Sequence, residues 1–114
     1  MIIRGGSLVT ASGAEFADVA IQAGRITEVG PDLPEQREEI DATGLHVLPG
    51  GIDPHVHFNE PGRTEWEDIA HGTAALLAGG YTAFIDMPLN NLPVTTTVAA
   101  FDRKISSAPP GELT

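Results

Sequence analysis

The chain has 114 residues, of which 41% are hydrophobic, a balance typical of a small globular domain and not of a disordered or fibrous protein. Sixteen acidic and six basic residues give a formal charge of −10, so binding to nucleic acid or to a membrane surface is not expected. The absence of cysteine excludes disulfides and thiolate zinc sites. The sequence has neither a long apolar run nor a secretory leader, so we expect a soluble, cytoplasmic protein.

Residues 1–50 contain short strand patterns separated by turn residues. Two glycines at 5–6 indicate a turn between two short strands. The alternating segments on either side of Ala23 and Gly24 predict a hairpin in which the glycine supplies a positive φ. Another short strand is expected at 45–48. A sheet this small needs a partner layer to bury its apolar face, and we interpret this segment as part of a small β-sandwich domain.

From residue 51 the pattern changes to an alternation of strands and helices. Residues 52–58 have the alternation of a strand. The sequence Thr-Glu-Trp-Glu at 64–67 is a capping box, which predicts that a helix begins there. Apolar residues then recur at helical spacing until the glycine pair at 79–80, which ends the helix. Trp66 belongs to this apolar set, and we expect it in the core.

A second unit of the same kind follows directly. A buried strand is predicted at 81–86, and a helix whose apolar face includes Val98 and Ile105 is predicted to end at 109–111, Pro-Pro-Gly. Consecutive strand–helix units imply parallel strands joined by right-handed crossovers. An α/β barrel of the TIM type, (β/α)8, needs about 250 residues. We therefore interpret 51–114 as the first two strand–helix units of an incomplete barrel, and the chain as a fragment.

The pattern His55-Val56-His57 is the strongest functional signal. Residues two apart on a strand point to the same face, so both imidazoles should project together, with Asp53 on the same side. A bare His-x-His pattern is common by chance. Here it lies at the carboxyl end of a predicted parallel strand, where barrel enzymes place their active sites. That position favours a site for a divalent transition metal.

The residues around the histidines resemble a known motif. Residues 49–57, Pro-Gly-Gly-Ile-Asp-Pro-His-Val-His, resemble the first metal motif of the amidohydrolase superfamily. The similarity is to its cyclic-amide branch of dihydroorotases, hydantoinases and allantoinases. Residues 40–44 and 47–50 match the usual lead-in to that motif. The resemblance covers nearly the whole chain, and the extended pattern is highly specific.

This resemblance implies a hydrolase with two divalent metal ions, taken to be zinc, in each active site. His55 and His57 would hold one metal, and the metals would acidify a bridging water. The carboxylated lysine, two further histidines and the catalytic aspartate of that scheme would follow Thr114. Lys104, the only lysine of the sequence, lies in a predicted helix with no sign of being the bridge. No catalytic residue is therefore expected within this chain, which should be inactive alone.

Within the branch, Asn59 and the residues after it discriminate between families. Residues 59–67 and 86–90 resemble the allantoinase version of the motif. That likeness implies opening of the hydantoin ring of allantoin to give allantoate, with Asn59 and Asn90 as substrate contacts, and a homo-oligomer, a tetramer, at full length. Allantoin is a neutral small molecule, so an amide can match its donors and acceptors without a fixed cation.

Three alternatives remain open from the sequence. Dihydroorotases usually carry arginine and hydantoinases commonly carry aspartate where this chain has Asn59, and this argues against either sister enzyme. A non-catalytic chain that pairs with a homologous subunit is a second alternative, and retention of both His55 and His57 argues against it. A small independent binding module is a third, and the incomplete strand–helix pattern disfavours it.

The remaining polar residues have simpler interpretations. His46 and His71 lack the company of other ligands and are expected to be structural or exposed. Asp86, at a strand end, is a candidate to orient a histidine ligand through its carboxylate. Asn91 lies in a loop flanked by prolines, where asparagine usually stabilises turns.

Overall fold

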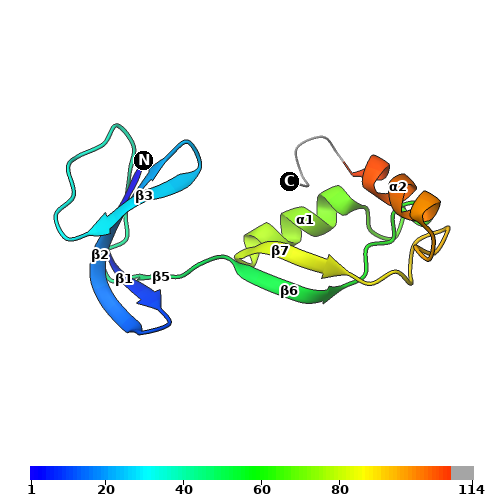
Figure 1. The fold of residues 1–114 in the computed structure, drawn as a ribbon, viewed down its shortest axis with the longest axis horizontal. Coiled ribbons are helices and arrows are strands. Elements are labelled where there is room, and N and C mark those ends of the chain that lie inside the picture. Colours follow the sequence, from blue (N-terminus) through cyan, green and yellow to red (C-terminus); the bar gives the residue numbers. More distant parts are fainter. Residues whose placement is uncertain (109–114) are drawn as a thin grey trace. The chain divides into compact units, whose positions relative to one another are not determined.

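The computed structural model describes residues 1–108 and divides the chain into two compact units, Met1–Pro49 and Gly50–Thr114. Figure 1 shows the elements of each unit. The helix break expected at 109–111 lies outside the described residues. Neither helix in the described part of the chain is long and apolar enough to cross a membrane.

The first unit is a five-stranded sheet. Its strands are β1 (Ile2–Thr10), β2 (Gly13–Gln22), β3 (Arg25–Gly30), β4 (Glu39–Asp41) and β5 (His46–Val47). The order is β3-β2-β1-β4, and β5 also pairs with β1. Strand β1 is antiparallel to β2 and parallel to β4 and β5, so it forms the centre of the sheet.

Two glycine-containing segments of this unit were predicted to be turns, and one of them is not. The turn expected at Gly5 and Gly6 is wrong, because β1 runs through both residues and its register with β2 shifts between Ile3 and Gly6. A φ of +69° at Gly5 accommodates this irregularity, so the glycine serves a bulge. The hairpin turn is confirmed, with φ of +50° at Ala23 and +73° at Gly24.

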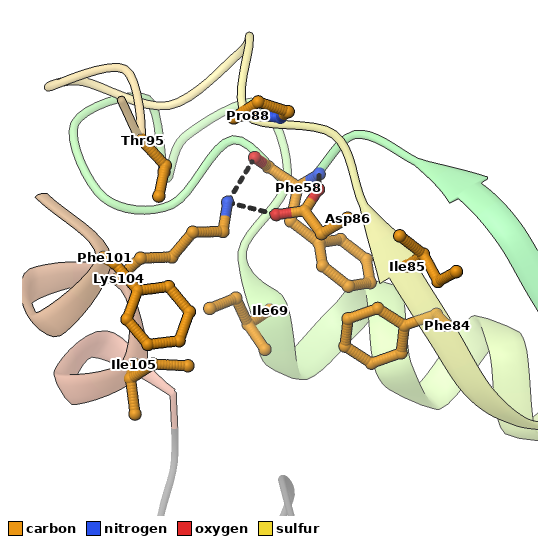
Figure 2. A pocket seen from close by; sticks show the side chains of 10 residues that line it. All are labelled: Phe58, Ile69, Phe84, Ile85, Asp86, Pro88, Thr95, Phe101, Lys104 and Ile105. Carbon is orange, nitrogen blue, oxygen red and sulfur yellow. Dashed lines mark hydrogen bonds and ion pairs between the residues drawn. The ribbon is translucent and has the colours of Figure 1, made fainter. Parts of the chain in front are cut away.

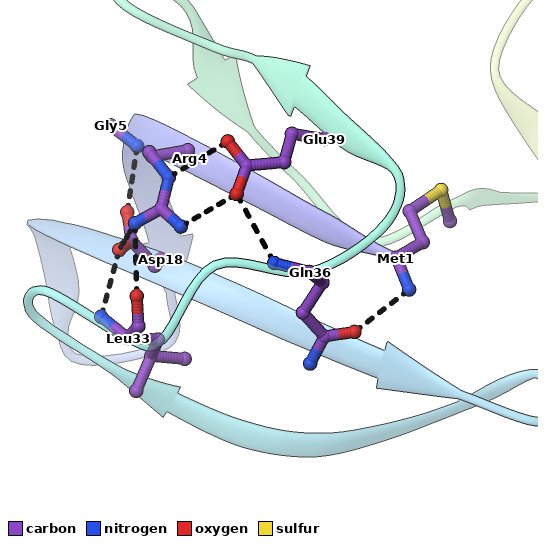
Figure 3. Close-up of polar contacts among 7 residues, drawn as sticks. All are labelled: Met1, Arg4, Gly5, Asp18, Leu33, Gln36 and Glu39. Atoms are coloured by element: carbon purple, nitrogen blue, oxygen red, sulfur yellow. Dashed lines mark hydrogen bonds and ion pairs between the residues drawn. The ribbon is translucent and has the colours of Figure 1, made fainter.

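Asp18 is buried in this sheet and joins three segments of the first unit (Figure 3). Its Oδ1 accepts from the Gly5 amide at 2.8 Å, and its Oδ2 accepts from the Leu33 amide at 3.1 Å and from Arg4 Nη1 at 2.9 Å. Arg4 also pairs with Glu39 at 2.9 Å. Three donors satisfy this carboxylate, which is only 6% exposed, as a buried charge requires.

The hydrogen-bonded Asp18 carboxylate is expected to make the stability of the first unit depend on acid pH. The Gly5 amide, then the Leu33 amide and the Arg4 cation, hold the pKa of Asp18 below its ordinary value of 3.8, against the opposing effect of burial. A lowered pKa in the folded state means that the stabilisation is complete above that ordinary value and is lost as the pH falls through the folded-state value. Asp18→Asn should therefore lower the melting temperature near neutral pH, and the difference from the parent should narrow as the pH falls below 3.8. Equal melting temperatures at neutral pH would contradict this role.

The second unit contains two strand–helix pairs (Figure 1). They are β6 (Gly51–Val56), α1 (Ile69–Ala78), β7 (Tyr81–Asp86) and α2 (Val98–Ser107). Strands β6 and β7 are parallel and directly paired, with α1 as the crossover between them. Helix α2 lies beyond the carboxyl ends of the two strands. The bounds of β7 agree with the prediction, and Thr97 caps α2 by accepting from the Ala100 amide.

Helix α1 begins later than predicted. The capping box expected at 64–67 is wrong, since residues 64–66 form a turn and the helix starts at Ile69. Asp68 is the N-cap, and its carboxylate accepts from the His71 amide at 2.6 Å. The Glu60 carboxylate accepts from the Ile69 amide at 2.9 Å. A tertiary contact from the loop after β6 thus satisfies another free amide at the helix start.

Trp66 is not in the core. It lies before α1 in the turn region and is 67% exposed, so the predicted burial is wrong. The guanidinium of Arg63 lies 5.1 Å from the centre of its ring. With the helix starting three residues further on, the helical spacing that grouped Trp66 with the apolar face does not apply to it.

Phe58 fills the contact between α1 and the end of β6. The ring is 3% exposed and meets Phe84 edge-on at 4.9 Å between centroids. It lies against Gly72 of α1, where a Cβ atom would fall far inside van der Waals contact with the ring. The absence of a side chain at position 72 therefore lets the helix approach the strand pair this closely.

Candidate metal centre

His55 and His57 come together at the carboxyl end of β6. Their Nε2 atoms are 3.0 Å apart, and their ring centroids are 5.0 Å apart with the planes inclined at 57°. The strand ends at Val56, so the first histidine is on the strand and the second is just beyond it. His55 is exposed and His57 is half-buried. The two imidazoles converge as the sequence predicts, although only His55 belongs to the strand.

The pair fits one side of a metal site. Two nitrogens bound to one ion at about 2.0–2.1 Å lie roughly 3.0–3.4 Å apart, and the observed 3.0 Å falls at the short end of that range. Nδ1 of His57 is buried without a hydrogen-bond partner. Within residues 1–108 no group of three or more His, Cys, Asp or Glu side chains is placed to hold a metal. The described residues thus bring together two candidate ligands, one fewer than the three protein ligands that a catalytic zinc normally has.

Asp53 does not join the two imidazoles as a ligand. Its Oδ1 accepts from the backbone amide of His55 at 3.0 Å. The carboxylate is thus used to fix the backbone at the first histidine. The sequence predicts Asp53 on the same side as the histidines, and its hydrogen bond is to the main chain.

The backbone just after His57 is held by two charged side chains (Figure 2). Oδ1 of Asp86, at the end of β7, accepts from the Phe58 amide at 3.0 Å. Nζ of Lys104, on α2, donates to the Phe58 carbonyl at 3.2 Å and forms an ion pair with Asp86. The sequence suggested that Asp86 could orient a histidine ring, but its carboxylate accepts from the backbone instead. It contacts the peptide that follows the second histidine.

An apolar cavity of about 310 Å³ adjoins this ion pair. Figure 2 shows Ile69, Phe84, Phe101 and Ile105 around it, with the Lys104 ammonium reaching past them to the Phe58 carbonyl. The side chains of Lys104 and Asp86 are 11% and 12% exposed. The pair thus lies in surroundings that screen charge poorly.

The three asparagines differ in their surroundings. Asn59 is 8% exposed, and its Oδ1 is buried without a hydrogen-bond partner. Asn90 is half-buried in the loop after β7. Asn91 is fully buried, and its Nδ2 donates to the Pro93 carbonyl and to Thr95 Oγ1, both at 2.8 Å. Asn91 therefore stabilises its loop, as predicted, while substrate contact by Asn59 and Asn90 stays a prediction.

The other two histidines have different surroundings. His46 is an exposed residue of β5. The side chain of His71 is 83% exposed and its Nδ1 pairs with Asp68 at 2.7 Å. Both agree with the structural or exposed roles expected of them.

Sequence reasoning missed the role of Lys104. The residue lies three positions after Phe101 and one before Ile105, so helical spacing places it beside the apolar face of α2. It is only 9% exposed. A lone lysine beside an apolar helix face was the available signal, because a buried ammonium requires an acceptor or an anion.

Comparison with known proteins identifies the family. Residues 46–111 match the amidohydrolase family. The allantoinase of Solibacter usitatus is 59% identical over 90% of this chain and 22% of its own length, and that of Rubrobacter xylanophilus is 58% identical over 95% and 24%. The allantoinase of Escherichia coli strain SMS-3-5 is 43% identical over the whole chain and 25% of its own length. The chain thus spans about a quarter of the length of these relatives.

Solved structures agree with this relationship. The D-hydantoinase from Bacillus sp. AR9 superposes with a TM-score of 0.77 at 38% identity, and the L-hydantoinase from Arthrobacter aurescens with 0.80 at 32% identity. Each comparison covers 94% of this chain and 24% of the solved one. The match of residues 46–111 includes both convergent histidines and most of the second unit. The chain belongs to the amidohydrolase family.

Proposed function

We propose that the full-length protein is an allantoinase, which hydrolyses the hydantoin ring amide of allantoin to give allantoate. The observation that carries this proposal is the convergence of His55 and His57 at the end of β6. It occurs in a chain that is 42–59% identical to allantoinases from several bacteria. Asn59 and Asn90 are proposed as substrate contacts, because their neutral amides complement the donors and acceptors of an uncharged ring.

The proposed cofactor is zinc, with two divalent ions in each active site. His55 and His57 would hold one ion through their Nε2 atoms, and other parts of the protein would complete the site. Bound there, the metal would polarise the ring carbonyl and lower the pKa of a water molecule. The Nε2 atoms can serve as ligands because neutral imidazole offers one bare nitrogen. Asp53 holds the amide of His55 and keeps that residue at the strand end.

The architecture supports placing this site in a barrel. We propose that unit 1 is part of a small β-sandwich domain and that unit 2 is the first two strand–helix units of a TIM-type barrel. The parallel pairing of β6 and β7 supports this, as does the exposure of Ile52 (66%) and Ile85 (55%), which further layers would cover. The proposal includes a homotetramer located in the cytoplasm.

The test is an activity comparison on the purified full-length protein. We expect allantoin to give the highest kcat/KM among allantoin, dihydroorotate and an unsubstituted hydantoin, with a margin of about 100-fold or more over the anionic dihydroorotate. Residues 1–114 alone are expected to be inactive, because their described part offers only two convergent metal ligands. A preparation with full metal content that favours dihydroorotate or hydantoin would overturn the assignment to allantoin in favour of a sister enzyme.

A further inference from the structure

We infer that Lys104 and Asp86 are positioning residues for the metal site, because they fix the backbone that directs His57 and Asn59. The inference rests on the proposed metal-binding role of His57. It assigns to Lys104, in the last turn of α2, and to Asp86 a task in metal binding, although their hydrogen bonds are to the Phe58 backbone and not to the imidazoles.

The hydrogen bonds of this pair act on two successive peptide groups. The Phe58 amide, which donates to Asp86, belongs to the peptide that joins His57 to Phe58. The Phe58 carbonyl, which accepts from Lys104, belongs to the peptide that joins Phe58 to Asn59. Both planes adjacent to the Phe58 Cα are thereby fixed, and with them the directions in which the two flanking side chains leave the backbone.

Asp86 and Lys104 hold the backbone just beyond the end of the paired strands. The last paired residues of β6 and β7 are Val56 and Asp86, and the Met87 amide donates to the Val56 carbonyl at 2.8 Å. His57 follows immediately and lies outside the strand. The pairing of β6 with β7 therefore ends at Val56, and the Asp86–Lys104 ion pair holds the segment that carries the second histidine.

The ion pair between Lys104 and Asp86 differs from an ordinary surface pair because it is buried. An exposed pair contributes little to structure, whereas a buried pair is tolerated only when its hydrogen bonds are satisfied. Here Asp86 accepts from the Phe58 amide as well as pairing with Lys104, and Lys104 donates to the Phe58 carbonyl as well. The alternative is that the pair only docks α2 against the strand ends, and that alternative predicts a loss of stability without a change in the metal site.

Lys104→Met in the full-length protein separates the two roles. Methionine keeps an apolar chain of similar length and removes the ammonium. We expect the zinc dissociation constant, measured by competition with a chelator well below the melting temperature, to rise about 10–100-fold. The visible spectrum of the cobalt-substituted protein should also change. Arg103→Met is the matched control, since Arg103 is the exposed neighbour on the same helix, and it should leave both measurements unchanged.

A second variant tests the same role without leaving a buried, unpaired carboxylate that could destabilise the fold. Asp86→Asn combined with Lys104→Met leaves no unpaired charge and keeps an amide oxygen able to accept from Phe58. It should melt above Lys104→Met and still bind zinc more weakly than the parent, because the donor to the Phe58 carbonyl is missing. If either variant folds and keeps the parental zinc affinity and cobalt spectrum, the pair is structural only and the inference is wrong.

The proposed function fails in different ways. If the parent protein has full metal content but does not hydrolyse allantoin, the proposed substrate is wrong. The positioning role of Asp86 and Lys104 is unaffected by that result. If His57→Ala keeps the parental metal content, His57 is not a metal ligand. The positioning role inferred for Asp86 and Lys104 is then wrong as well.

Discussion

His57→Ala in the full-length protein is expected to remove metal and allantoin hydrolysis together. Each imidazole supplies one of the two convergent Nε2 atoms, and a site reduced to His55 alone on this strand loses a ligand that no described residue replaces. We expect at least one equivalent of metal to be lost and kcat to fall by about 10³-fold or more, equivalent to ~4 kcal/mol of transition-state stabilisation. His55→Ala should behave in the same way.

The measurement pairs elemental analysis of metal with turnover of allantoin on the same samples. His46→Ala is the control, because that histidine is exposed in β5 and belongs to the first unit. It should retain the parental metal content and kcat. Retention of full metal and full activity by His57→Ala would exclude this histidine as a ligand and would remove the main support for the proposed function.

Asn59→Arg should depress allantoin turnover while leaving metal content intact. The native side chain is 8% exposed and has a free, buried Oδ1, so it offers a neutral acceptor. Arginine would add a cation that is costly to bury unless an anion pairs with it. We expect kcat/KM to fall by about 100-fold, because poor placement of the ring is what lowers the rate. One change should not create dihydroorotate hydrolysis, since the rest of the pocket is unaltered.

Asn59→Ala separates the loss of the amide from the added bulk. Removal of one hydrogen bond to substrate should lower kcat/KM by roughly tenfold, in line with ~1–1.5 kcal/mol for a neutral hydrogen bond. Steady-state kinetics and metal content, measured for all three proteins, give the comparison. If both variants hydrolyse allantoin as well as the parent does, Asn59 does not line the substrate site.

Local sequence signals predict the elements of this chain well where no tertiary contact decides the outcome. The strand Tyr81–Asp86 and the turn at Ala23 and Gly24 follow from such signals. The start of α1 does not follow from local sequence signals. Thr64 and Asp68 are both competent N-cap residues, and the contact from Glu60 to the Ile69 amide accompanies the later one. No local pattern contains that contact.

Some features of the candidate site are likewise predictable from local sequence, and others are not. The convergence of His55 and His57 is predictable, because the two residues are two apart in an extended segment at the end of β6. The arrangement around Phe58 is not, because its partners Asp86 and Lys104 lie 28 and 46 residues away in the sequence. Periodicity indicates that Lys104 lies beside an apolar face, but only the packing of α2 at the strand ends identifies its acceptor.

The contact between Phe58 and Gly72 couples the side chains that these two positions of the chain can carry. As long as residue 58 carries a large ring in its present place, any side chain at position 72 would collide with it. Conversely, a small residue at 58 would leave a void beside α1 that only a larger residue at 72 could fill. The two positions are therefore expected to change together or not at all. Because residue 58 also carries the peptide groups next to His57, helix packing and the proposed metal site both depend on position 58.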